Sequence, residues 1–347
     1  MARAMKRGML EVQFNWIFII IAGAVILAFF FSIIQKQRSV SEEKLSLALI
    51  NELDAITTGA ASSKGSAQRI DLPRTGIDFG CSDECACAFR VGSLSRDYRD
   101  KIIFSPNHIE GKDIVFWTLP WNVPFRAGNF LYVTNDRIKY FFVSDSSTPS
   151  LQLKAQLQQE LPDKINAEFI EPSQICSSDA GCVKNENYQQ VKFVFLETTP
   201  SVTTFHESFK DTDITGVHLS GSQATFFKCY PQRTGDCEQS GALSYIGDAG
   251  LFATIFAYDD NMYRCNMQEA VKRLSYVAQV MENRAIVLQA NGDLLRCGYS
   301  TTNLEVLRSG AAAQVDALAD LGSLTVAAQS IAGENEALLR QSCPTIY

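Results

Sequence analysis

Cysteines are the residues whose number and spacing carry the most chemistry in this sequence. The 347-residue chain has ten of them, and none lies among the first 80 residues. An even number, with several close in sequence, is typical of a disulfide-bonded protein from an oxidising compartment. Cys176 and Cys182 enclose a short loop of turn-forming residues, as do Cys229 and Cys237. We therefore predict one local disulfide in each pair.

The remaining cysteines lie far apart in sequence. Two C-terminal helices are predicted: an apolar stripe from Met267 to Leu288 indicates the first, and the Ala/Leu-rich run from Leu304 to Leu339, with glycines as possible kinks, indicates the second. Cys265 lies at the start of the first, and Cys343 follows the second. If these helices are antiparallel their outer ends meet, which predicts a Cys265–Cys343 disulfide. Cys297 would then pair with one member of the cluster Cys81-x₃-Cys85-x-Cys87.

The alternative for this cluster is a zinc site with His108 as the fourth ligand. Standard zinc knuckles use paired two-residue spacings, and this single set is irregular. Disulfides are therefore the preferred interpretation, and we predict no metal site.

The sequence has no recognisable catalytic motif. His206-Glu207 begins like a metallopeptidase helix, but Lys210 occupies the position of the second histidine. His218 lies in an apolar run that is typical of a buried strand. There is no nucleophile elbow, Walker loop or dinucleotide-binding glycine motif. We predict no catalytic residue and no cofactor; a hydrolase that uses His108, His206 or His218 as a base is the alternative.

An aromatic and proline-rich stretch, WTLPWNVPF, is the candidate contact region. Its large side chains are Trp117, Trp121 and Phe125. They form either a surface that binds a partner or a buried loop, and their apolar character favours the buried loop.

The element that places all of these residues is an apolar segment near the N-terminus. Residues 14–34 contain no charge. As a helix they span about 31 Å, which matches a hydrocarbon core of about 30 Å. The run is longer than the apolar part of a secretory signal and has no A-x-A site. We predict a retained transmembrane helix that contacts the lipid bilayer.

The flanks of this segment indicate its orientation. Arg3, Lys6 and Arg7 precede it, which favours a cytoplasmic N-terminus and an extracytoplasmic C-terminal part. Within the segment, Ala24, Ala28 and Ser32 recur every four residues. Such a stripe of small residues allows close helix packing and predicts self-association.

The residues Lys6-Arg7-Gly8-Met9-Leu10-Glu11, followed by the apolar run, resemble the class III signal of type IV pilin-like proteins, especially archaeal ones. The resemblance implies cleavage after Gly8 and an apolar helix that packs in a filament core. The sequence departs from the bacterial pattern, because Gln13 rather than Glu11 is the fifth residue after the cut. The rest of the chain resembles uncharacterised archaeal single-span surface proteins. A simple anchor with a basic tail is the alternative.

Composition limits the partners of the chain. It is 46% hydrophobic and 20% charged with a net charge of −7, values that are typical of a globular protein. A nucleic-acid partner is not predicted, because phosphate binding needs clustered Lys and Arg.

We predict an α/β or α+β fold with an N-terminal transmembrane helix and stalk, a mixed-sheet ectodomain and C-terminal antiparallel helices. Strand, helix and strand alternate over residues 146–230, which indicates parallel pairing, and Asn135-Asp136 suits a hairpin turn. The predicted regions are residues 1–13 as a tail or leader, 14–34 as the span, 35–68 as stalk helix and linker, 69–245 as the disulfide-containing ectodomain and 246–347 as a helical domain. Leu45, Leu49, Leu53 and Ile56 lie on one face of the stalk helix, where a partner helix is an option, and residues 57–68 are the predicted flexible linker.

Together these features predict a membrane-anchored extracytoplasmic protein that acts by binding or surface assembly. Its partners would be the bilayer, a second copy through the span, and an unidentified extracellular protein or ligand. The alternatives are a pilin-like filament subunit and an anchored hydrolase.

Overall fold

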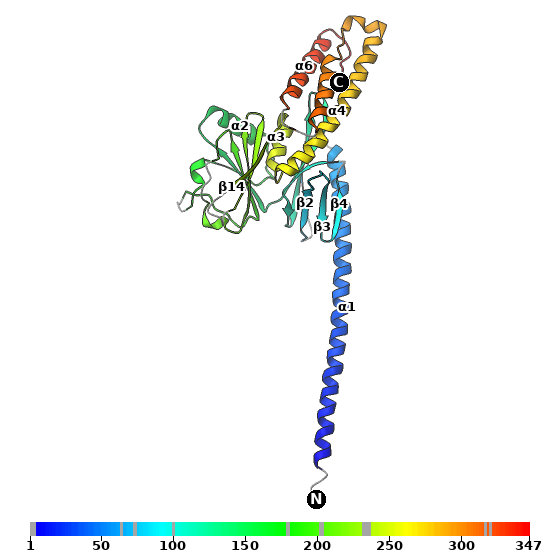
Figure 1. Ribbon diagram of the computed structural model, residues 1–347, viewed down its shortest axis with the longest axis vertical. Helices are drawn as coiled ribbons and strands as arrows, with labels where there is room; N and C mark the ends of the chain where they lie inside the picture. Colours follow the sequence, from blue (N-terminus) through cyan, green and yellow to red (C-terminus); the bar gives the residue numbers. More distant parts are fainter. Residues whose placement is uncertain are drawn as a thin grey trace.

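A computed structural model of the chain shows a long helix that projects from a mixed α/β head (Figure 1). It describes residues 5–62, 65–71, 75–98, 101–177, 181–200, 205–230, 237–315, 318 and 321–347. The α-helices are α1 (Met5–Ser62), α2 (Thr148–Glu160), α3 (Gly247–Phe256), α4 (Asp260–Ala290), α5 (Thr302–Gln314) and α6 (Gly322–Arg340). Three short 3₁₀ helices are η1 (Pro172–Gln174), η2 (Glu207–Phe209) and η3 (Gly292–Cys297).

Helix α1 is uninterrupted over 58 residues, a length of about 87 Å. Its N-terminal part extends away from the head, and its C-terminal turns lie against the head (Figure 1). The predicted span and stalk are therefore one helix. The helix also runs through Thr57 and Thr58 to Ser62, where a flexible linker was predicted. Both threonine hydroxyls donate to the Asp54 carbonyl, and Thr57 is buried against the head, so tertiary packing outweighs the small polar composition.

Two four-stranded sheets form the half of the head that contacts α1. The first has the order β1-β7-β8-β5, and the second has the order β4-β3-β2-β6. Their strands are β1 (Ala67–Asp71), β7 (Asp113–Asn122), β8 (Arg126–Thr134) and β5 (Ile102–Phe104), followed by β4 (Leu94–Asp97), β3 (Cys87–Val91), β2 (Ile77–Cys81) and β6 (His108–Ile109).

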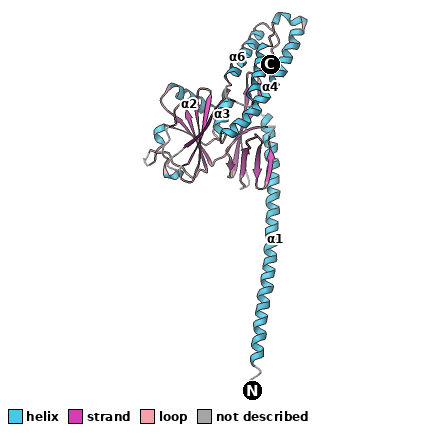
Figure 2. Cartoon of the chain, in the orientation of Figure 1, coloured by secondary structure: helices cyan, strands magenta, loops and turns pink. Residues whose placement is uncertain are grey.

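The third sheet has six strands in the order β10-β9-β11-β12-β13-β14. They are β10 (Ala167–Ile170), β9 (Ile138–Ser144), β11 (Gln190–Leu196), β12 (Asp213–Ser220), β13 (Gln223–Cys229) and β14 (Cys237–Ser244). The first four run parallel to one another and the last two pair antiparallel. Figure 2 shows this sheet beside the smaller ones. The predicted mixed sheet is confirmed.

The hairpin predicted at Asn135-Asp136 is wrong. Strand β8 belongs to the first sheet and β9 to the six-stranded sheet, so the chain changes sheet at this point. Asn135 makes the turn without a hairpin. Its Oδ1 accepts from the Arg137 N–H at 3.1 Å, and its Nδ2 donates to the Glu110 carbonyl at 3.2 Å.

The C-terminal helices run alternately up and down. Arg308 of α5 contacts Glu282 near the end of α4 at 2.8 Å, whereas Val315 lies with Gln268 near the beginning of α4. Likewise, Asn303 at the start of α5 bonds to Glu334 of α6 at 2.6 Å. Helices α4 and α5 are therefore antiparallel, as are α5 and α6. The sequence suggested one kinked helix where the structure has α5 and α6.

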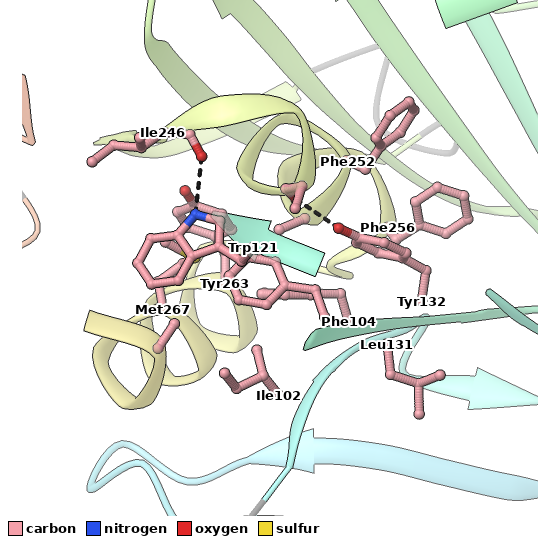
Figure 3. Close-up of a cluster of buried hydrophobic side chains, with 14 of the residues drawn as sticks. Ile102, Phe104, Trp121, Leu131, Tyr132, Ile246, Phe252, Phe256, Tyr263 and Met267 are labelled. Carbon is pink, nitrogen blue, oxygen red and sulfur yellow. Dashed lines mark hydrogen bonds between the residues drawn. The ribbon is translucent and has the colours of Figure 1, made fainter. Parts of the chain in front are cut away.

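One apolar core joins α1, the two smaller sheets and the C-terminal helices, and it extends from Leu49 to Ile346. Figure 3 shows its centre, where Tyr132 packs beside Phe252 and Phe256 of α3. A second core lies around Phe193 in the six-stranded sheet. The larger core thus contains both the α1 junction and one face of the six-stranded sheet.

Candidate functional site

The junction between α1 and the head fixes the projecting helix. Leu49, Ile50 and Leu53 are all buried there, and α1 contacts β3, β4, β7 and β8. Their burial contributes about 1.5–3 kcal/mol each. The predicted face Leu45-Leu49-Leu53-Ile56 is thus partly correct, since Leu45 stays 45% exposed. The buried part of this face packs on the protein's own strands rather than on a partner helix.

Polar contacts reinforce the same junction. The ammonium group of Lys101, itself buried, pairs with the Asp54 carboxylate of α1. The hydrogen bond from Lys101 lowers the pKa of Asp54, which favours the carboxylate form of this side chain. Arg96 of β4 donates to Asn51 Oδ1 at 2.9 Å. These contacts attach the last turns of α1 to β4 and to the residue directly before β5.

Four cysteines gather beside this junction. Cys81 and Cys87 face each other across β2 and β3 and form one disulfide. Cys85, in the turn between these strands, bonds to Cys265 of α4. The sulfur atoms of Cys81, Cys87 and Cys265 all lie within 4.8 Å of one another. The cluster therefore ties the β2–β3 turn to the longest helix of the head.

The predicted Cys265–Cys343 disulfide is wrong. Cys343 bonds to Cys297 and Cys265 bonds to Cys85. The prediction assumed two C-terminal helices. The structure has three, and the third, α6, ends near the C-terminal end of α4, far from Cys265 at its beginning. The assignment of Cys297 to the Cys81-Cys85-Cys87 cluster fails for the same reason.

The two local disulfides, Cys176–Cys182 and Cys229–Cys237, are present as predicted. The second joins residues that face each other across β13 and β14. Each of the ten cysteines is in a disulfide. The zinc alternative loses its thiolate ligands, because Cys81, Cys85 and Cys87 are all in disulfides.

A pocket of about 410 Å³ opens at the cysteine cluster. Its wall combines the Cys85–Cys265 disulfide with the buried Tyr98, whose pKa is raised by burial. Charged side chains of both signs line it, namely Glu84, Glu269, Lys101 and Lys272. No histidine or free thiol is among its described lining residues. This lining can bind a small polar molecule but presents no activated nucleophile.

The three histidines lie on separate elements. His108 is on β6, His206 caps the 3₁₀ helix η2, and His218 is on β12. Burial lowers the pKa of His218. His108 hydrogen-bonds to the carboxylate of Asp78. No cysteine thiol among the described residues is free to act as a nucleophile beside any of the three histidines. The histidines do not converge on one site.

The aromatic stretch is buried. Trp117, Trp121 and Phe125 are at most 4% exposed, and the Trp121 indole donates to the Ile246 carbonyl at 3.1 Å (Figure 3). The contact-surface hypothesis for these residues is therefore wrong, and the buried alternative is confirmed. Trp117 and Trp121 lie on β7, which pairs with β8, and Phe125 lies in the turn between the two strands. The Trp117 ring packs on Phe252 and Phe256 of α3, Trp121 stacks on Phe130, and Phe125 packs on Tyr347.

Exposed apolar side chains occur instead on α4. Tyr276, Val280 and Val287 are 59–70% exposed. With Asn283 they follow a spacing of four, three and four residues, which places them on one helix face. The spacing of these residues is visible in the sequence. The apolar stripe from Met267 to Leu288, which forms the buried face of the same helix, is more regular and dominates the pattern.

The exposed segment of α1 is a second apolar surface among the described residues. Ile19–Gln37 has a mean hydropathy of 2.2 and is not buried, and it is the one membrane-span candidate among the described residues. Gly8 lies within α1, in a part whose side chains fall outside the described residues. Comparison with protein-family models, with curated proteins and with solved structures finds no match.

Proposed function

We propose that this protein is a single-span membrane protein whose head lies outside the cytoplasm and acts by binding or surface assembly. The observation that carries the proposal is helix α1. Its segment Ile19–Gln37 is apolar and uncovered, whereas its last turns are built into the core of the head. Leu27, for example, is 71% exposed. A continuous apolar surface of this length is unfavourable in water and is stable when lipid or another helix covers it.

Two features support an extracytoplasmic head. Five disulfides are stable in an oxidising compartment. The basic residues Arg3, Lys6 and Arg7 precede the span, which is the arrangement of a cytoplasmic N-terminus.

The geometry of α1 also supports a spacer role. Eight helical residues, 38–45, separate Gln37 from Ser46, the first described residue of α1 that is buried at the junction. They hold the head about 14 Å from the end of the span. The exposed face of Tyr276, Val280 and Val287 lies on α4 near the end of the molecule opposite the N-terminus (Figure 1). This face is suited to an apolar contact with another protein.

A second candidate is a pilin-like filament subunit. The continuous helix with a protruding apolar half supports it, since such a helix would pack into a filament core after cleavage behind Gly8. Ala24, Ala28 and Ser32 would then lie between neighbouring copies.

Protease treatment of intact and ruptured cells tests the main proposal. We expect the head to be degraded on intact cells, and the chain to stay in the membrane after alkaline carbonate extraction. A Leu27→Arg variant should be released from the membrane, whereas Tyr276→Ala, which lies outside the span, should not. A head that survives until the cells are ruptured would contradict the topology.

N-terminal sequencing separates the two candidates. A chain that retains its residues before Gly8 is the anchored form. A chain that begins at Met9 and is recovered in sheared filaments is the pilin-like form.

A further inference from the structure

Three side chains with complementary chemistry meet at the edge of the six-stranded sheet. Lys139 is on β9, Glu168 is on β10, and Asn166 directly precedes β10. Strands β9 and β10 are parallel with Tyr140 opposite Ala167, so Lys139 and Asn166 are neighbours across the pair. The Lys139 Nζ lies 3.3 Å from Asn166 Oδ1 and 2.9 Å from Glu168 Oε2.

The surroundings of the amine are apolar on one side and open on the other. Lys139 is 9% exposed, and its Nζ lies 5.5 Å and 5.7 Å from the ring centres of Phe141 and Tyr188. The Glu168 side chain is 49% exposed and borders a pocket of about 320 Å³ together with Lys139 and Tyr188. The amine is thus held in place, and a small leaving group can escape to solvent.

The amide of Asn166 is held in one orientation. Its Nδ2 donates to the Asp136 carbonyl at 3.3 Å, which leaves Oδ1 toward Lys139. A nucleophile, an acyl carbon and a proton carrier are therefore side by side without any metal or oxidant.

We propose that Lys139 and Asn166 form an intramolecular isopeptide bond and that Glu168 carries the proton. The Lys139 ammonium gives one proton to the Glu168 carboxylate, and the neutral Nζ attacks Cγ of Asn166. The Nζ–Cγ bond forms and the Cγ–Nδ2 bond breaks. Glu168 delivers its proton to the leaving nitrogen, and the proton that the attacking nitrogen then loses passes through the regenerated Glu168 carboxylate to the departing ammonia, so the products are an amide and ammonium. The carbon keeps its oxidation state.

The bond would staple an exposed edge of the sheet. Strand β10 is the terminal strand and has four residues, and its free edge is open to solvent or to other strands. The link would close a loop across a sequence separation of 27 residues, longer than either local disulfide. This inference does not depend on the membrane topology of the chain.

The mass of the purified full-length protein in detergent, measured after reduction of the disulfides, tests the proposal. We expect it to lie about 17 Da below the sequence mass, which is the loss of one ammonia. Tandem mass spectrometry of a protease digest should find one branched peptide that contains both Lys139 and Asn166. A wild-type protein at its full sequence mass overturns the proposal.

Variants separate this bond from cyclisation of Asn166 with its own backbone, which loses the same mass. Lys139→Arg and Glu168→Gln should both restore the full mass, and Glu171→Gln, an exposed neighbour outside the triad, should keep the loss. If Lys139→Arg still shows the loss, the asparagine has cyclised alone and the isopeptide bond is refuted. The mass and the digest of the wild-type protein decide the question by themselves, so the test remains valid even if a variant misfolds.

Discussion

Lys192 provides the sharpest quantitative test of the head. It lies on β11, a central strand that pairs with β9 and β12, and it is 3% exposed. Its ammonium group donates to the Ala257 carbonyl and, at 3.3 Å, to the Thr254 carbonyl at the end of α3. Burial lowers the pKa of Lys192 from 10.5 to about 7.

This shift makes stability depend on pH in a definite direction. Between the two pKa values the unfolded chain binds a proton at Lys192 that the folded chain has released, so the free energy of unfolding rises with pH. With a folded pKa of about 7, the free energy of unfolding should rise by about 2 kcal/mol between about pH 7 and about pH 9. This gain in the free energy of unfolding is lost as the pH falls back to the pKa of Lys192 in the folded protein, about 7.

Urea denaturation of the detergent-solubilised protein at several pH values measures this slope. A change of about 2 kcal/mol corresponds to a midpoint shift on the order of 1 M urea. A Lys192→Met variant should lose this increase, whereas a variant of the exposed Lys272, Lys272→Met, should keep it. Identical slopes in wild type and Lys192→Met would refute the reasoning.

Three further changes probe the junction and the core. Leu53→Ala should lower the free energy of unfolding by about 2–5 kcal/mol, and Leu45→Ala, at an exposed position, should leave it nearly unchanged in the same urea titration. Replacement of Cys85 and Cys265 together by serine should cost about 5 kcal/mol, because their disulfide closes a loop with a sequence separation of 180; calorimetry at matched pH measures the loss. Trp121→Phe should cost about 1–3 kcal/mol, because the buried Ile246 carbonyl loses its donor, and an unchanged thermal midpoint would contradict that role.

Features set by neighbours in sequence were predictable here. The apolar run around Leu27, the inner stripe of α4, the alternation that indicates parallel strands, and the Cys176–Cys182 disulfide all depend on residues within about one element of each other. Their physical basis is local, because helix and strand periodicity place side chains on faces without reference to the rest of the chain.

The tertiary structure decided what depends on how distant elements meet. The number of C-terminal helices determined that Cys343 meets Cys297, and the change of sheet at Asn135 separated two strands that are adjacent in sequence. Trp121 is buried because α3 covers it, and Lys139 lies beside Asn166 because β10 pairs with β9. Composition and spacing carry no information on such pairings, since they follow from the one packing that buries the shared core of all these elements.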